Sequence, residues 1–283
     1  MSLLQTDRLQ VELAPDQVNL VHSERRLTLR GMRTTVWNEW LAAAAAGPEE
    51  APWRGAVQAL ATALPARAGG AARARARVIL TNRLVRYVLV PWSDALGDAG
   101  EEAAFARHCF ERVYGEAAVQ WELRVSDARD GLPKLASAVD AALPGALREV
   151  FAAAGVRLDS IQPGLMAVCN DYRRRLRGRH AWLALLEPGN LVLALLDHGR
   201  WVRVRSMRIG PGWRVELAQV LEREAYLADP EAATRDVFLW ASGLGDVKLP
   251  ENDRWQFHLL APEARHGSAT AAAGPTLITA AEG

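Results

Sequence analysis

Two short turns in the sequence combine an acidic residue with proline and a small residue. They are Glu12-Leu13-Ala14-Pro15-Asp16 and Glu187-Pro188-Gly189-Asn190. An acid at such a turn can orient hydrated Mg²⁺, and free backbone N–H groups can bind phosphate oxygens. Proline has no N–H group, so each turn loses one donor. The turns therefore suggest phosphate chemistry but lack some of the groups it needs, and the simpler interpretation of Glu12 and Glu187 is two acids on solvent-exposed hairpins.

Motifs of other common active sites are absent from the sequence. It contains no GxxxxGK[ST], no GxGxxG after a strand, no GxSxG and no HExxH, so P-loop, dinucleotide-binding, hydrolase and zinc-protease sites have no anchor. The six histidines are scattered, and Cys109 and Cys169 have no Cys or His neighbour at metal-ligand spacing. We therefore predict no catalytic residues and no metal site.

The two turns belong to segments that resemble each other. Residues 11–33 and 183–208 each read as strand, Pro-containing turn, strand, turn, strand, and aligning their third strands makes Arg30 and Met32 match Arg205 and Met207. A duplicated meander followed by alternating helices and strands predicts an α/β fold of two similar βββαβα halves. The alternative is a chance similarity between two ordinary meanders.

Hydrophobic periodicity predicts the remaining elements. We expect helices near residues 53–64, 101–114, 132–154, 165–177 and 214–228, and strands near 78–80, 87–90, 119–125, 158–161, 236–240 and 255–260. These elements divide the chain into a first half, residues 1–154, and a second half, residues 155–264. The Ala-, Gly- and Thr-rich residues 265–283 have no apolar periodicity, which predicts a disordered tail.

Three stretches carry a resemblance to a known family. They are Ala-Gly-Val-Arg-Leu-Asp-Ser-Ile-Gln-Pro-Gly-Leu-Met-Ala at 154–167, Glu187-Pro188-Gly189, and Ala241-Ser242-Gly243-Leu244-Gly245. Together they resemble the actin-like assembly proteins of type IV pili and type II secretion: PilM, the cytoplasmic part of GspL, and the MshI group. The resemblance covers most of residues 8–262. It implies a compact, duplicated ribonuclease-H-like (actin-like ATPase) fold and a cytoplasmic scaffold that binds the tail of an inner-membrane assembly protein.

The resemblance also implies where a nucleotide site would lie, between the two hairpins and a small-residue loop. The implied cofactor-binding positions are Glu12, Ala14, Glu187, Gly189, Asn190, Ser242 and Gly243. Glu12 and Ala14 stand where the family has Asp and Gly, and the second turn lacks the family's hydroxyl. We therefore expect a degenerate site with no cofactor, or with weak binding of ATP and Mg²⁺, in a non-catalytic scaffold. The alternative is an active actin-like ATPase or small-molecule phosphotransferase with an unusual site.

Composition bears on location and partners. The 283 residues have a net charge of +1 and only two cysteines, which fits a soluble protein of the reducing cytoplasm. The start resembles no signal peptide, and no apolar run is long enough to span a membrane. The arginine-rich run 173–179 reads as a solvated helix end, with an acidic partner or lipid headgroups as the alternative. Because no aromatic residues are interleaved with these arginines, we expect no nucleic-acid binding. A position at the inner membrane would then come from a partner, not from direct insertion.

Overall fold

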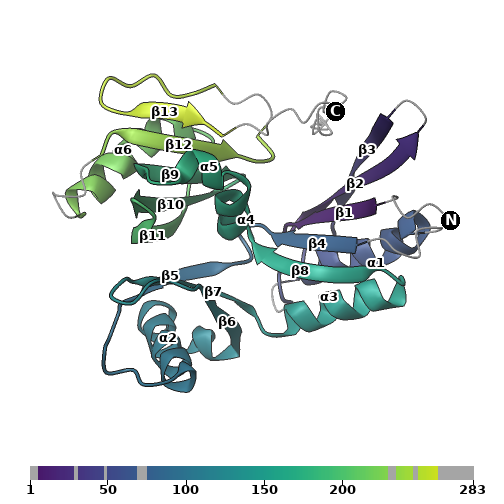
Figure 1. Ribbon diagram of the computed structural model, residues 1–283, viewed down its shortest axis with the longest axis horizontal. Coiled ribbons are helices and arrows are strands. Elements are labelled where there is room, and N and C mark those ends of the chain that lie inside the picture. Colours follow the sequence, from purple (N-terminus) through teal and green to yellow (C-terminus); the bar gives the residue numbers. More distant parts are fainter. Residues whose placement is uncertain are drawn as a thin grey trace, which may run out of the picture.

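The computed structural model describes residues 6–28, 31–47, 50–68, 75–228, 234–244 and 248–260. Two five-stranded sheets dominate it, and they have the same strand order (Figure 1). The first is β3-β2-β1-β4-β8, and the second is β11-β10-β9-β12-β13. In each sheet three antiparallel strands are followed by two parallel ones. The predicted duplication is therefore confirmed, as is the α/β fold class.

The strands of the first sheet are β1 (Thr6–Leu13), β2 (Gln17–Thr28), β3 (Gly31–Ala42), β4 (Arg75–Leu80) and β8 (Arg157–Pro163). Those of the second are β9 (His180–Glu187), β10 (Asn190–Asp197), β11 (Arg200–Arg208), β12 (Asp236–Ala241) and β13 (Gln256–Leu259). Helix α1 (Arg54–Ala68) joins β3 to β4, and α6 (Trp213–Tyr226) joins β11 to β12 in the equivalent place. Among the described residues no helix lies between β12 and β13, so the second half is shorter than the expected βββαβα unit.

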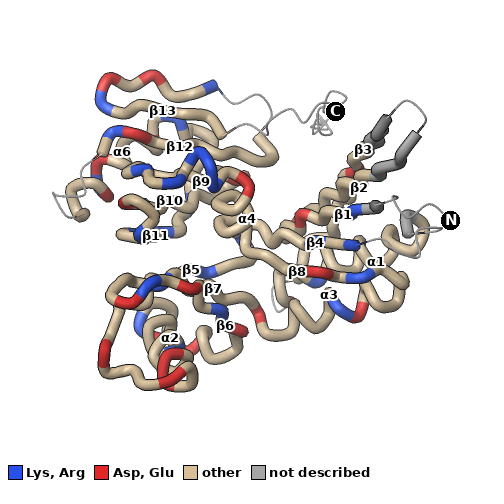
Figure 2. The backbone as a smooth tube through the Cα atoms, viewed as in Figure 1, with Lys and Arg blue, Asp and Glu red and all other residues tan. Residues whose placement is uncertain are grey.

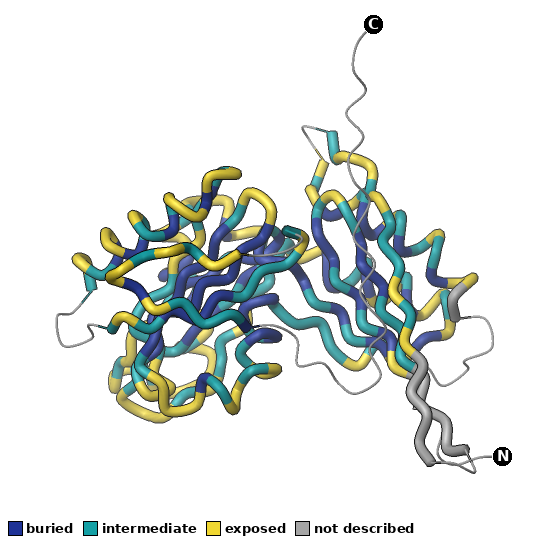
Figure 3. The backbone as a smooth tube through the Cα atoms, turned by 90° about the horizontal axis from the view of Figure 1, so that it is seen from above, coloured by how far each residue is buried: buried dark blue, intermediate teal, exposed yellow. Residues whose placement is uncertain are grey.

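Strands β9 and β10 at the centre of the second sheet are buried on both faces, and they are apolar at nearly every position. Along β9, Trp182, Ala184 and Leu186 pack on one face with residues of α6. The alternate residues Leu183 and Leu185 join a core that includes α4 (Gly164–Asp171) and α5 (Arg173–Leu176). Figure 3 shows the buried residues along the middle of the strands and the exposed ones at the rims.

A small subdomain interrupts the first half between β4 and α3 (Ala142–Ala153). Its three-stranded sheet has the order β5-β7-β6, and α2 (Ala99–Tyr114) and a 3₁₀ helix (Gly115–Gln120) complete it. The strands are β5 (Arg86–Val90), β6 (Trp121–Val125) and β7 (Lys134–Asp140). The helix expected over 132–154 is therefore wrong for its first third. Residues 134–140 contain two alanines, whose helix propensity is high, but pairing with β5 and β6 decides their conformation.

The expected alignment of the two third strands is also wrong. Strand β2 continues to Thr28 and strand β3 begins only at Gly31, so residues 27, 28 and 31–33 lie at the far end of these two strands, and Arg30 lies outside the described residues. The strand register shows which residues are equivalent. The first residue of β2, Gln17, pairs with Ala42 at the end of β3, and the first residue of β10, Asn190, pairs with Arg208 at the end of β11. The β2–β3 hairpin is longer than its counterpart, which displaces the matching residues along the strand.

Sheet pairing also bears on the boundary between the halves. Strand β8 pairs with β4 in the first sheet, although it follows the boundary expected at residues 154 and 155. We propose a boundary after α5, near Arg177. The tail expected over 265–283 lies outside the described residues. No helix in the described part of the chain is both long and apolar enough to cross a membrane.

Candidate functional site

Glu12 and Glu187 converge on a small cavity between the two hairpins. Glu12 lies on β1, and Glu187 is the last residue of β9. The cavity measures about 20 Å³ and is lined by Glu12, Ala14, Gln17, Trp40, Thr81, Arg83, Glu187, Pro188 and Ser242. That volume holds about one water molecule. The hairpins are thus packed together at the place where the resemblance implies a nucleotide.

Asn82 holds the Glu187 carboxylate from the first half. The backbone N–H and the side-chain amide of Asn82 both donate to Glu187 Oε1, at 3.0 and 2.7 Å. The Tyr87 hydroxyl donates to Asn82 Oδ1 at 2.7 Å, and the backbone N–H of Leu165, at the start of α4, donates to the same oxygen at 3.0 Å. This buried network ties the β4–β5 loop, α4 and the second sheet together.

The environment of Glu187 favours its neutral form. Only 3% of the residue is exposed, and burial raises the pKa of Glu187 to about 7, with the charge of Glu12 adding to the effect. The two hydrogen bonds from Asn82 oppose the rise. Glu187 Oε2 and the neighbouring Thr81 Oγ1 are buried with no hydrogen-bond partner among the described residues.

Glu12 is bound by the loop after β12. The Ser242 hydroxyl donates to Glu12 Oε1 at 3.0 Å, a contact between residues 230 positions apart. Burial raises the pKa of Glu12, while the hydrogen bonds with Ser242 and Asn19 oppose that rise. Gly243 has a φ of +70°, and a Cβ there would lie 3.3 Å from Pro188 Cγ. Ser242 and Gly243 therefore close the gap between the hairpins.

Four of the seven predicted site residues line the cavity: Glu12, Ala14, Glu187 and Ser242. Gly243 packs directly behind it, against Pro188. Gly189 and Asn190 do not line it; Gly189, with a φ of +74°, forms the β9–β10 turn, and Asn190 begins β10. The interpretation as a solvent-exposed hairpin residue is wrong for Glu187, which is buried. Glu12 is half-buried, and its carboxyl accepts a hydrogen bond from Ser242.

Asn82 and Tyr87 were not predicted as site residues from the sequence. Thr81-Asn82-Arg83 reads as a plain connection between two strands, yet it follows the buried strand β4, which lies between β1 and β8. The carboxyl ends of parallel strands are where polar groups gather in α/β sheets. The position of Asn82 at the end of a buried parallel strand could have marked it as a site residue. No sequence feature marks Tyr87, because it lies within β5.

A second, larger opening lies between the small subdomain and the first sheet. This cleft measures about 350 Å³ and is lined by Leu80, Glu122, Arg124, Ser137, Val139, Pro144, Arg148, Leu158, Asp159, Ser160, Ile161 and Pro163. Two of its walls are β6 and β8, and each is the outermost strand of its sheet. Its lining includes charged residues of both signs, and Figure 2 shows acidic and basic positions along β6 and β8. Arg124 pairs with Glu122 at 2.7 Å, and Arg75 pairs with Asp159 at 2.7 Å.

Comparison with solved structures identifies the fold. Neither protein-family models nor curated proteins match the sequence. The structure is similar to the cytoplasmic domain of EpsL, an inner membrane component of the type II secretion system of Vibrio cholerae, with a TM-score of 0.54 and 13% identity over 90% of each chain. It is also similar to the PilM-PilN type IV pilus biogenesis complex, with a TM-score of 0.58 and 15% identity over 83% of this chain and 81% of that one. The chain has the duplicated actin-like fold of these pilus and secretion proteins, which confirms the fold that the resemblance implied.

Proposed function

We propose that the protein is a non-catalytic, actin-like scaffold of a type IV pilus or type II secretion-type assembly system. The observation that carries the proposal is the hydrogen bonding of the two hairpin acids. The Glu12 carboxyl accepts a hydrogen bond from Ser242, and the Glu187 carboxyl accepts one from the Asn82 side chain, around a cavity of about 20 Å³. Groups that satisfy one another in this way hold two halves of a molecule together and leave little for a phosphate to bind.

The same geometry argues against tight nucleotide binding. Small-molecule pockets measure about 300–1,000 Å³, so ATP would have to separate the hairpins and break both contacts. We expect a dissociation constant for Mg·ATP weaker than about 100 μM, less than roughly 5.5 kcal/mol of binding, and no hydrolysis above background. Isothermal titration with Mg·ATP measures the affinity. Micromolar binding that Glu187→Ala abolishes would instead support an active actin-like ATPase or phosphotransferase.

The partner, in this proposal, is an extended segment from the cytoplasmic tail of an inner-membrane protein. An extended peptide can add to the open edge of a sheet by main-chain hydrogen bonds, while apolar pockets receive alternate side chains. The cleft between β6 and β8 has two such edges and includes Val139, Leu158 and Ile161. Association with the inner membrane would follow from this contact.

Arginine substitutions at two serines of the cleft test partner binding. Ser160 on β8 and Ser137 on β7 are partly exposed within it, so Ser160→Arg and Ser137→Arg add bulk without removing an apolar core contact. Ser206→Arg is the matched control, because Ser206 is exposed on β11, outside the cleft. We expect both cleft variants, but not the control, to lose co-purification with inner-membrane protein and to move from the membrane to the soluble fraction. Equal retention of all three variants would refute the docking site.

A further inference from the structure

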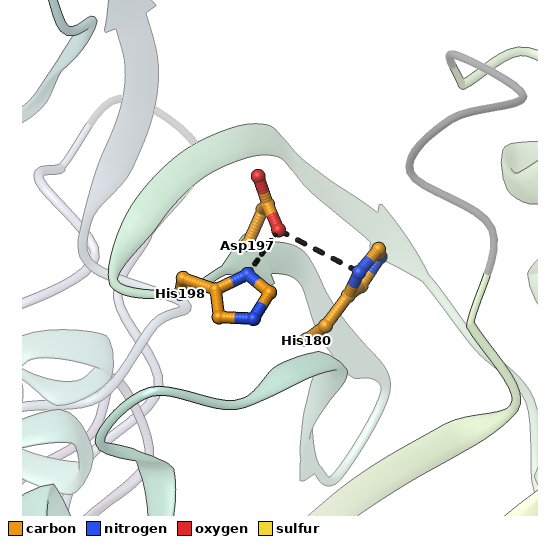
Figure 4. Close-up of side chains that lie close together, drawn as sticks. All are labelled: His180, Asp197 and His198. Atoms are coloured by element: carbon orange, nitrogen blue, oxygen red, sulfur yellow. Dashed lines mark hydrogen bonds and ion pairs between the residues drawn. The ribbon is translucent and has the colours of Figure 1, made fainter.

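Two histidines and an aspartate meet at the end of the second sheet that is remote from Glu187. His180 begins β9, and Asp197, its direct partner in the register, ends β10. His198 follows in the β10–β11 turn (Figure 4). Because β9 runs eight residues from His180 to Glu187, at about 3.3 Å per residue the cluster is roughly 23 Å from the hairpin acids. It is therefore independent of the proposed scaffold function.

The three side chains point at one another. Asp197 Oδ1 lies 3.5 Å from His180 Nδ1 and 2.7 Å from His198 Nδ1, and the three ligand-type atoms all lie within 4.8 Å of one another. His180 Nε2 is buried and has no hydrogen-bond partner in the described part of the chain. Nδ1 is thus the nitrogen through which the His180 ring interacts.

Surrounding groups fix this arrangement. Arg200 Nη2 donates to the other carboxylate oxygen, Asp197 Oδ2, at 2.9 Å, which leaves Oδ1 directed at the imidazoles. The backbone N–H of His198 donates to the carbonyl of Arg179 at 2.9 Å. His198 and Gly199 have φ values of +51° and +92°, the conformation of a two-residue hairpin turn in which Asn-Gly is the usual sequence. A histidine therefore stands at a turn position whose positive φ Asn would adopt equally well.

We propose that His180, Asp197 and His198 form a binding site for a divalent transition metal, with Zn²⁺ as the ion that suits it best. Two imidazole nitrogens and one carboxylate oxygen are the donor set of many zinc sites, with water completing the tetrahedron. Zinc bonds of about 2.0–2.1 Å place neighbouring ligand atoms roughly 3.3 Å apart. The pair formed by His180 and Asp197 already has this spacing, and the exposed His198 ring reaches it with a shift of about 1 Å.

The ion would fasten the β10–β11 turn to the start of β9. Only one carboxylate contributes charge, and Arg200 places a positive charge beside it, so we expect micromolar affinity. The cluster was not predicted from the sequence because its spacing reflects hairpin pairing: residues 180 and 197 become neighbours only through the register of β9 and β10. No local ligand motif connects them.

Zinc titration of untagged protein, followed by calorimetry, tests the site. The variants are His180→Ala, Asp197→Asn and His198→Asn, of which the last keeps a residue that tolerates the left-handed turn. His258→Asn is the matched control, because His258 also faces an aspartate, Asp236, at 2.7 Å but lies outside the cluster. We expect one Zn²⁺ per chain for the wild type and the control, and at least about 100-fold weaker binding for the other three.

Two further measurements use the same proteins. Co²⁺ in the wild type should give the intense visible absorption of a four-coordinate ion, and His198→Asn should remove it. Saturating Zn²⁺ should raise the Tm of the wild type by about 5 °C and leave that of His198→Asn unchanged. Absence of saturable binding, or equal zinc affinity in the wild type and His198→Asn, would overturn the assignment and leave a hydrogen-bonded His–Asp–His group.

Discussion

The Glu187 carboxyl is almost fully buried and accepts two hydrogen bonds from Asn82 on one oxygen only. Its pKa of about 7 means that the folded protein binds a proton that the unfolded chain releases near its ordinary value of 4.5. The stability linked to this group is therefore complete below about pH 4.5 and is lost as the pH rises through about 7.

Glu187→Gln should remove this pH dependence. Glutamine keeps an oxygen that can accept from Asn82 and cannot ionise. We expect the variant and the wild type to have similar free energies of unfolding at pH 5, and the variant to be more stable by about 2 kcal/mol at pH 8. Urea unfolding at both pH values measures the difference. Glu111→Gln, at an exposed position on α2, is the control and should change neither value.

Asn82 organises the site, and its hydrogen bonds predict unequal effects of neighbouring substitutions. Asn82→Ala would remove the side-chain donor to Glu187 and the buried acceptor shared by the Tyr87 hydroxyl and the Leu165 N–H, and would leave Glu187 only the backbone N–H of residue 82. Tyr87→Phe removes one hydroxyl and leaves the Leu165 bond to Asn82 intact. Unpaired buried groups are the larger penalty, so we expect losses of about 3 and 1 kcal/mol respectively. Thermal unfolding of the two variants gives the ranking, and equal losses would contradict it.

At the scale of elements, α4 is held close to the end of β4 by a glycine. A Cβ at Gly164 would lie 3.1 Å from Asn82 and from the Leu80 carbonyl oxygen, whereas one at Gly145 in α3 would meet nothing within 4 Å. Gly164→Ala must move the helix away from the strand, but Gly145→Ala only improves helix propensity. We expect the first to destabilise the protein by about 1 kcal/mol and the second to stabilise it by about 0.5 kcal/mol. Chemical denaturation distinguishes the two signs.

Elements with a clear local pattern were predicted correctly, and those decided by pairing were not. The second meander has Pro188-Gly189 and His198-Gly199 between apolar strands, and all three of its strands were found. Strand β7 was read as part of a helix, since its alanines carry a helical preference that only the neighbouring strands override. The site was half predicted for the same reason: Glu12 and Glu187 stand at recognisable turns, while Asn82 matters only through contacts made in space.

At the scale of the whole molecule, the second sheet depends on a segment that precedes it. Its face carrying Leu183 and Leu185 shares a core with Leu165, Val168 and Leu176 of α4 and α5. A fragment that starts at His180 would expose this face to water. A fragment that starts at Gly164 would keep its cover.

We expect residues 164–260 to be more soluble than residues 180–260 when each is expressed alone. The reason is the apolar area of β9 and β10 that α4 and α5 bury. Binding of a hydrophobic dye by the soluble fractions should be stronger for the shorter fragment. Comparable solubility and dye binding of the two fragments would show that α4 and α5 do not shield the apolar face of β9 and β10.

The bond from Ser242 to Glu12 has a consequence for how the protein is made. It joins residues 230 positions apart, so on the ribosome Glu12 emerges long before its partner. At about 5–20 residues per second, this acid stays hydrated and ionised for some ten seconds or more while the rest of the chain is synthesised. The hairpins can close only after β12 has been translated. Closure of the gap between the two hairpins is therefore among the last events of biosynthesis. In a chain that terminates before Ser242, Glu12 lacks this partner and the gap stays open.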